Sequence, residues 1–180
     1  SEEHRRAYRS LLATTEGLNK HISGVILYEE TLFQNSTAAA GGTPLVELFL
    51  QQGIVPGIKV DQGVEALAGG VAGESWCTGL KALGERASRY YARGARFAKW
   101  REVYEIGPKA PTQHGMQANA EMLARYAAVC QAEGLVPIVE PEVLMDGGHD
   151  IKRHAEVTEA VQQAVFEALR RHHVALELML

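Results

Sequence analysis

Short apolar runs alternate with longer amphipathic runs along the chain. Most apolar runs are rich in β-branched or aromatic residues and short enough for buried strands. The predicted strands are Ile22–Tyr28, Val55–Asp61, Phe97–Val103, Leu135–Glu140 and Val174–Leu180. Helical periodicity predicts helices at Glu2–Ala13 and at about Pro44–Gln52, Trp76–Arg93, Gln117–Glu133 and Glu156–His173. Strands that alternate with helices pair in parallel, so the pattern predicts an α/β fold with crossover helices.

Glycines at the helix ends support this reading. Gly53, Gly94 and Gly134 each stand between a predicted helix and the next strand, where the left-handed conformation that closes a helix is needed. The repeating unit is about 40 residues long, which is longer than the ~30 residues of a minimal strand–helix–strand unit. Eight units of the longer kind need roughly 300 residues, which is within the usual range for a (β/α)8 barrel. About five strands therefore indicate an open sheet or part of a barrel. The first strand is followed by no Gly-x-Gly-x-x-Gly motif, and the sequence has no P-loop, which weakens the case for a nucleotide-binding sheet.

Composition narrows the function classes. The chain has 180 residues, of which 46% are hydrophobic and 22% charged, and its formal net charge is −4. This charge argues against bulk binding of nucleic acid, and no run approaches the ~20 apolar residues of a membrane span. Cys77 and Cys130 are far apart, fall in predicted helices and lack metal-binding spacing, so we expect free thiols.

Charged residues at the ends of apolar strands are the most informative feature. Lys59 ends the second strand, Lys99 and Arg101 lie on the third, and Glu140 and Glu142 follow the fourth. Residues two apart share a face of a strand, provided that the fourth strand continues through its proline. A half-buried charge lowers the stability of the fold unless it is paired with an opposite charge, so its presence needs a reason.

We expect these charges to converge where the carboxyl ends of parallel strands form a ligand site. Lysine and arginine bind phosphate oxygens, and a carboxylate beside a lysine can transfer protons. The site would therefore suit a phosphorylated substrate; a structural ion-pair network is the alternative. His149, Asp150 and His154 form only a loose metal-like cluster, which we interpret as a solvated loop and helix start.

Six motifs resemble class I fructose-bisphosphate aldolases in order and spacing. They are Ser23–Leu32 (SGVILYEETL), Val55–Gly63 (VPGIKVDQG), Phe97–Arg101 (FAKWR), Leu123–Cys130 (LARYAAVC), Val136–Val143 (VPIVEPEV) and Asp146–Arg153 (DGGHDIKR). The resemblance covers the whole chain. Glu74–Gly79 and Tyr90–Arg101 are most similar to plastid-type members.

The resemblance implies a (β/α)8 barrel, of which residues 1–180 would be a single incomplete domain. It implies reversible cleavage of fructose 1,6-bisphosphate to dihydroxyacetone phosphate and glyceraldehyde 3-phosphate, in glycolysis, gluconeogenesis or the Calvin cycle. The chemistry would use a lysine Schiff base with no cofactor and no metal. The expected partners are the sugar phosphate and three further copies in a homotetramer, with no nucleic acid and no membrane. The expected location is intracellular, in the plastid or cytoplasm, with the plastid favoured.

Matching positions carry the family's roles. Lys59 resembles the phosphate-binding lysine, and Arg101 resembles a substrate-binding arginine. Lys99 resembles the catalytic lysine that assists carbon–carbon cleavage. Glu140 resembles the acid/base of Schiff-base formation, and Glu142 resembles the carboxylate that supports the lysines. These roles agree with the chemistry of the residues, because a Schiff base is an electron sink whose formation needs positioned proton transfers.

The family's Schiff-base lysine lies in a pattern like E-G-x-L-L-K-P. Here the matching segment, Leu176–Leu180, reads LELML, so the Schiff-base lysine is absent and would fall two places beyond Leu180; Leu178 stands where the family has glycine. We expect the native chain to continue. The alternatives are a non-catalytic truncated remnant that acts as a binding or assembly piece, and another Schiff-base aldolase or phosphosugar-binding barrel.

The missing lysine makes a testable prediction. Residues 1–180 alone should show no normal aldolase turnover in a coupled assay, because no nucleophile stands at the expected position. Turnover comparable to that of a complete family member would contradict this and would indicate Lys99 or Lys59 as the nucleophile.

Overall fold

The computed structural model describes residues 1–180. The chain forms one parallel sheet of four strands. Its strands are β1 (Gly24–Leu27), β2 (Val55–Lys59), β5 (Phe97–Tyr104) and β6 (Val136–Val143), in the order β1-β2-β5-β6. The strand order follows the chain order, as it does in a (β/α)8 barrel. The predicted α/β architecture with crossover helices is confirmed.

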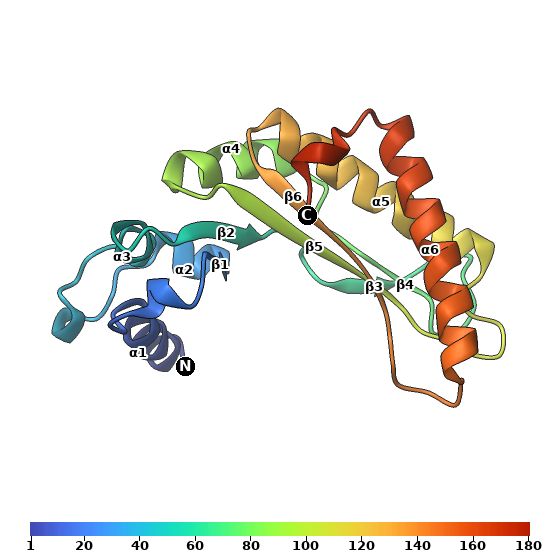
Figure 1. Ribbon diagram of the computed structural model, residues 1–180, viewed down its shortest axis with the longest axis horizontal. Helices are drawn as coiled ribbons and strands as arrows, with labels where there is room; N and C mark the ends of the chain where they lie inside the picture. Colours follow the sequence, from blue (N-terminus) through green and yellow to red (C-terminus); the bar gives the residue numbers. More distant parts are fainter.

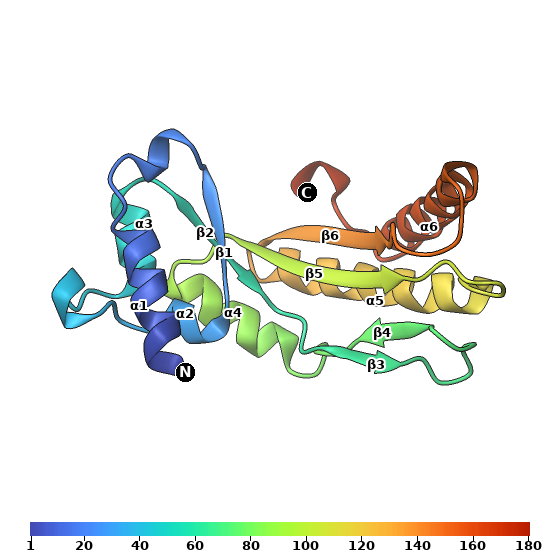
Figure 2. The same ribbon diagram turned by 90° about the horizontal axis from the view of Figure 1, so that it is seen from below.

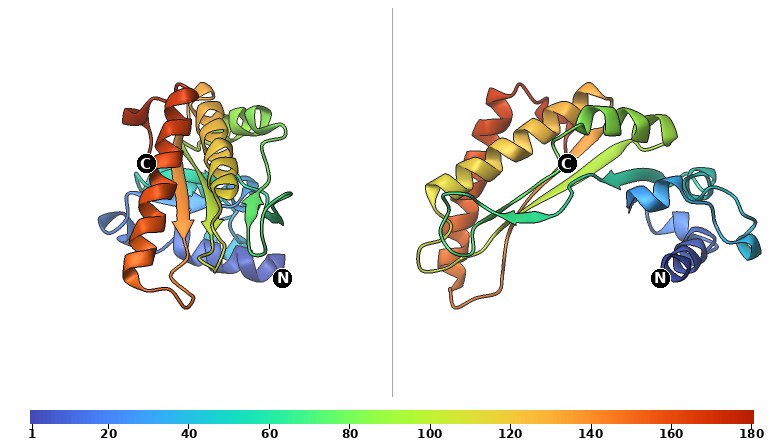
Figure 3. Two further views of the ribbon diagram at one scale, coloured as in Figure 1. Left: turned by 90° about the vertical axis from the view of Figure 1, so that its right-hand side faces the viewer. Right: turned by 180° about the vertical axis from the view of Figure 1, so that it is seen from behind.

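Six α-helices accompany the sheet. They are α1 (Glu2–Ala13), α2 (Glu29–Phe33), α3 (Leu45–Gln51), α4 (Leu83–Arg93), α5 (Gln113–Ala132) and α6 (Ile151–Arg171). Figure 1 shows α1, α2 and α3 at the β1–β2 end, and α4, α5 and α6 along the rest of the sheet. Figure 3 shows α5 and α6 side by side on the outer side of β5 and β6; the opposite face of these two strands is the inner side. None of the helices has the length and apolar composition needed to cross a membrane.

The main core lies between the sheet and these helices. The indole of Trp100 on β5 packs against Tyr126 of α5, with ring centroids 5.4 Å apart, and both side chains are fully buried. The Tyr126 hydroxyl donates a hydrogen bond to the Ile138 carbonyl of β6, 3.1 Å away. One aromatic pair thus fixes α5 over two neighbouring strands, and burying two such large side chains is worth several kcal/mol.

Strand β5 separates two environments by strict alternation. Ala98, Trp100, Glu102 and Tyr104 are buried on the helix side, and the residues between them are partly exposed on the inner side. Successive side chains of a strand point to opposite faces, so this single strand serves both the core and the open face.

The structure corrects two sequence predictions. The predicted fifth strand, Val174–Leu180, is wrong: a 3-10 turn covers Leu176–Leu178, and only Leu180 bonds to β6, through Pro137 and Val139. The sheet therefore has four parallel strands rather than five.

The second correction concerns the predicted helix Trp76–Arg93, whose first residues are extended. Strands β3 (Val64–Ala66) and β4 (Ser75–Cys77) form an antiparallel hairpin that the sequence analysis missed, and Cys77 lies in β4 rather than in a helix. Three-residue strands are too short to show a period of two. The glycine caps are confirmed, because Gly53, Gly94 and Gly134 all have positive φ.

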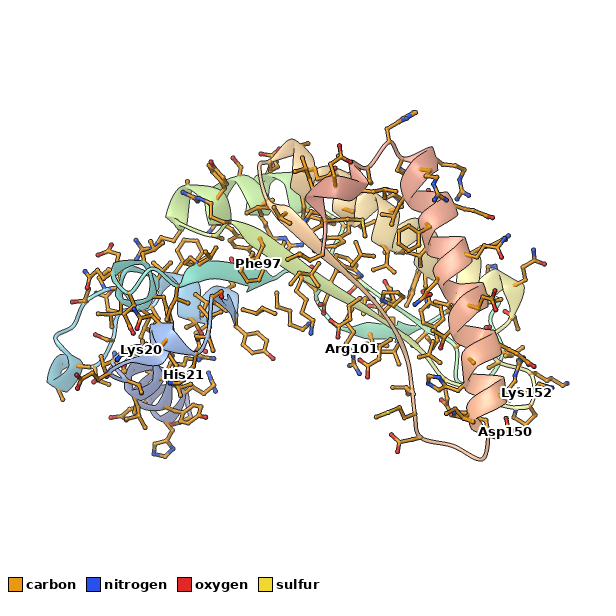
Figure 4. All side chains as sticks on the ribbon, in the orientation of Figure 1. Lys20, His21, Phe97, Arg101, Asp150 and Lys152 are labelled. Atoms are coloured by element: carbon orange, nitrogen blue, oxygen red, sulfur yellow. The ribbon has the colours of Figure 1, made fainter.

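One glycine on β2 makes room for an aromatic side chain at the base of the inner face. Gly57 pairs with Phe97, and a Cβ added at Gly57 would come within 2.1 Å of the Phe97 ring. Figure 4 shows Phe97 near the amino end of β5, well separated from Arg101.

Gly57→Ala should therefore destabilise the native protein by about 1–3 kcal/mol, the usual cost of overpacking. Thermal or urea unfolding would measure the change. Gly148→Ala is the matched control, because Gly148 has an ordinary φ and no atom within 4 Å of its added Cβ. Equal stability of the two variants would contradict the packing argument.

Candidate active site

The predicted site residues meet on one face of three adjacent strands, at the end of β2, in the middle of β5 and in the carboxyl half of β6. Lys59 of β2 pairs in register with Lys99 of β5, and Arg101 of β5 pairs with Glu140 of β6. Strand β6 continues through Pro141, so Glu142 follows Glu140 on the same face. The predicted convergence of these five side chains is thus what the structure shows.

Ion pairs between the strands organise these residues. The Lys99 ammonium lies 2.7 Å from Glu140 Oε2, and the Arg101 guanidinium bonds to Glu142 Oε2. All four side chains are between a quarter and two fifths exposed, so water screens each pair and its net stabilisation is small. The charges therefore stay accessible to a ligand from the open side of the sheet.

The two pairs differ in their hydrogen bonding. A hydrogen bond from Arg101 lowers the pKa of Glu142, and the same bond raises the pKa of Arg101. The Lys99–Glu140 contact has a charge-pair distance without hydrogen-bond geometry, so the buried Glu140 Oε2 has no hydrogen-bond donor. Arg101 thus holds Glu142 by a hydrogen bond, whereas Glu140 Oε2 is held by the charge of Lys99 alone.

Lys59 has a partner that the sequence analysis overlooked. Its ammonium pairs with Asp61, two residues further along, whose side chain is only 3% exposed. Asp61 Oδ2 is buried and accepts no hydrogen bond. The spacing of two between Lys59 and Asp61, both inside the predicted strand, was the signal that could have identified this pair.

A second carboxylate was also missed, on the opposite face of β5. Glu102 is completely buried, and it accepts hydrogen bonds from Trp100 Nε1 and from the Cys77 backbone N–H, both at 2.8 Å. Burial raises the pKa of Glu102 to about 7, although these two donors act against it. A charged residue flanked at spacing two by Trp100 and Tyr104 was the available signal.

The hairpin is held to α5 by a further carboxylate. Glu74 accepts the backbone N–H groups of Thr112, at 2.6 Å, and of Val71, at 2.9 Å, and the Thr112 hydroxyl, at 2.8 Å. Burial acts to raise the pKa of Glu74, but these donors outweigh it and lower the pKa. Asn119 of α5 adds a hydrogen bond of 2.9 Å to the Ser75 carbonyl. Figure 2 shows the hairpin running beside β5 and α5.

The remaining candidates of the sequence have structural roles. Asp150 caps α6 by accepting the Arg153 backbone N–H at 2.8 Å, and the His149 and His154 rings stack 5.6 Å apart across this cap. Such a contact around an N-cap resembles a hydrophobic staple. No group of three or more metal-ligating side chains occurs in the chain. Cys77 and Cys130 are free, and burial raises the pKa of each to about 12, so both thiols are unreactive.

Comparison with known proteins gives one consistent result. The family model described as fructose-bisphosphate aldolase class-I matches residues 1–180. Cytosolic fructose-bisphosphate aldolase 5 of Arabidopsis thaliana is 56% identical over 98% of this chain, and fructose-bisphosphate aldolase 2 of Caenorhabditis elegans is 54% identical over 98%. These matches cover 48% and 47% of the relatives, so the chain spans about half of their length.

A solved structure agrees with these sequence matches. The fructose-bisphosphate aldolase of Plasmodium falciparum, in complex with TRAP and a small-molecule inhibitor, superposes with a TM-score of 0.94 at 48% identity, over 99% of this chain and 51% of that one. The likeness confirms a partial barrel-like α/β fold. Several plant relatives are named cytosolic, including the cytoplasmic isozyme of Spinacia oleracea, so the preference for a plastid-type member is not supported.

The buried Glu102 predicts a pH-dependent stability. Its folded pKa of about 7 exceeds the ordinary 4.5, so the folded state holds the proton more tightly than the unfolded state. The resulting stabilisation is complete below about pH 4.5 and disappears as the pH rises through 7. Glu102→Gln cannot titrate, so its stability relative to the wild type should rise by up to about 3 kcal/mol between pH 5 and 8. Urea unfolding across this range measures the difference; parallel pH profiles would contradict the assignment.

Proposed function

Because this chain belongs to the class I fructose-bisphosphate aldolase family, we propose that the native protein cleaves fructose 1,6-bisphosphate reversibly through a lysine Schiff base. The observation that carries this proposal is the placement of Lys99–Glu140 beside Arg101–Glu142 on one face of adjacent parallel strands, level with the carboxyl end of β2. That end of a barrel is where catalytic side chains gather. The sugar phosphate is the substrate, and no cofactor is required.

The cations are suited to the phosphates of this substrate. Lys59 and Arg101 stand on neighbouring strands with their charged groups partly exposed on the open face. Arginine offers a planar set of donors and lysine a compact charge, and both bind phosphate oxygens. Asp61 and Glu142 hold these cations in place before substrate arrives. We assign substrate binding to Lys59 and Arg101, and the support of the cations to Glu142.

Lys99 and Glu140 are suited to the covalent steps. Formation of an imine from a lysine amine and the substrate ketone expels water, so the leaving hydroxyl must receive a proton. Glu140 has an oxygen without a hydrogen-bond donor, next to the Lys99 ammonium, and can carry that proton. The Lys99 charge then stabilises the oxygens of the substrate as the carbon–carbon bond breaks. We infer that the nucleophilic lysine lies outside residues 1–180.

The open face supports a larger assembly around this half. Ile26 and Val55 are more than 40% exposed on the inner side, where a hollow of about 480 Å³ is lined by these residues together with Phe97 and Ile138. Apolar positions of this kind fill the interior of a closed barrel. We infer that residues 1–180 form one part of a single (β/α)8 domain. We infer a homotetramer, as the family resemblance implies, and a cytosolic location, which the names of several plant relatives support.

Glu140→Gln tests the chemical assignment. In the native protein this variant should slow Schiff-base formation by on the order of a hundredfold, because an amide cannot deliver the proton. Borohydride trapping of the enzyme with fructose 1,6-bisphosphate, followed by mass spectrometry, measures the rate.

Glu156→Gln is the matched control. Glu156 forms an exposed pair with Arg153 on α6 and has no contact with the five site residues, so its loss should leave trapping unchanged. An unchanged trapping rate in Glu140→Gln would refute the acid/base role of Glu140.

A further inference from the structure

Glu102 is the one fully buried charged residue of the chain, and it stands directly behind the candidate site. Its neighbours on β5, Arg101 on one side and Lys99 two residues further back, point to the opposite face. Burying a carboxylate is costly, so its presence directly after Arg101 needs a reason. The reason lies in what its two oxygens hold.

Each oxygen of Glu102 accepts one fixed donor. Oε1 accepts the Trp100 indole N–H, and Oε2 accepts the backbone N–H of Cys77 on β4. The Cys77 thiol in turn donates to the Arg101 carbonyl, 2.7 Å away. These last two contacts tie β4 to β5 at the position of Arg101, in place of a regular strand ladder.

The same hairpin continues directly from the Lys59–Asp61 pair. Gln62 N–H donates to the Thr78 carbonyl at 2.8 Å, and Thr78 N–H donates to the Gly63 carbonyl at 2.9 Å. Asp61 therefore lies immediately before the first hydrogen bonds of the hairpin. A shift of β4 against β5 would move Asp61 and its partner Lys59. The position of β4 links the two cations that we assign to phosphate binding.

We propose that Glu102 is a positioning residue, which sets the spacing of Lys59 and Arg101 by holding β4 against β5 from behind the site. This inference rests on the proposed aldolase function. A carboxylate is required because both partners are donors, whereas the amide of glutamine offers one acceptor and one donor group. A residue that only supported the core would affect unfolding and leave substrate binding unchanged.

The test compares two isosteric or near-isosteric variants of the native protein. Glu102→Gln leaves the Cys77 N–H or the indole N–H without an acceptor, and it should raise KM for fructose 1,6-bisphosphate about tenfold while kcat changes less than twofold. Trp100→Phe removes the indole donor and leaves the Cys77 contact intact. It should lower thermal stability without changing KM.

Cys77→Ala gives a second, independent variant. It keeps the Glu102 bond to the backbone N–H and removes the thiol bond to Arg101, so it should raise KM to a smaller degree. If Glu102→Gln does not fold, this variant tests whether the tie between β4 and β5 sets the position of Arg101. If the wild type is active and KM is unchanged in both Glu102→Gln and Cys77→Ala, the positioning role is overturned. The aldolase assignment would still stand. A wild type that does not cleave fructose 1,6-bisphosphate would overturn the proposed function instead.

Discussion

The two-sided alternation of β5 is the constraint on which the rest of this structure depends. One strand must bury Trp100 and Glu102 against the helices while it presents Lys99 and Arg101 to the open face. Because side chains alternate with a period of two, a slip of one residue would exchange the core and the site. The aromatic contact between Trp100 and Tyr126 fixes this register, and the charges on the other face follow from it.

The neighbouring strands then complete what β5 begins. Parallel pairing brings β2 and β6 to either side of β5, so that the cations of β2 and β5 lie on one face of the sheet beside the carboxylates of β6. Pairing offsets the cost of half-burying these charges, while partial exposure keeps the pairs weak enough for a phosphate to compete. The same open face carries apolar residues toward the amino ends of the strands, which separates an apolar base from a polar rim.

Much of this arrangement could be predicted from the sequence, because it depends on long periodic segments. The helix Glu2–Ala13 and the strands around Lys59, Lys99 and Glu140 were predicted, as was the convergence of the five charged residues. The hairpin was missed because β3 and β4 have only three residues each. The final segment failed as a strand since Leu176–Leu178 turn instead of extending. Glu102 and Asp61 were missed because their importance depends on burial, for which the spacing of two from neighbouring strand residues was the only local signal.

A structure of the native protein crystallised with fructose 1,6-bisphosphate tests the central claim most directly. The account predicts electron density for the sugar phosphate on the open face of the sheet, with phosphate oxygens at Lys59 and Arg101 and the sugar backbone beside Lys99 and Glu140. Density at the amino ends of the strands, or on the helix side, would contradict it. So would a bound substrate that leaves the Lys99–Glu140 and Arg101–Glu142 pairs without contact.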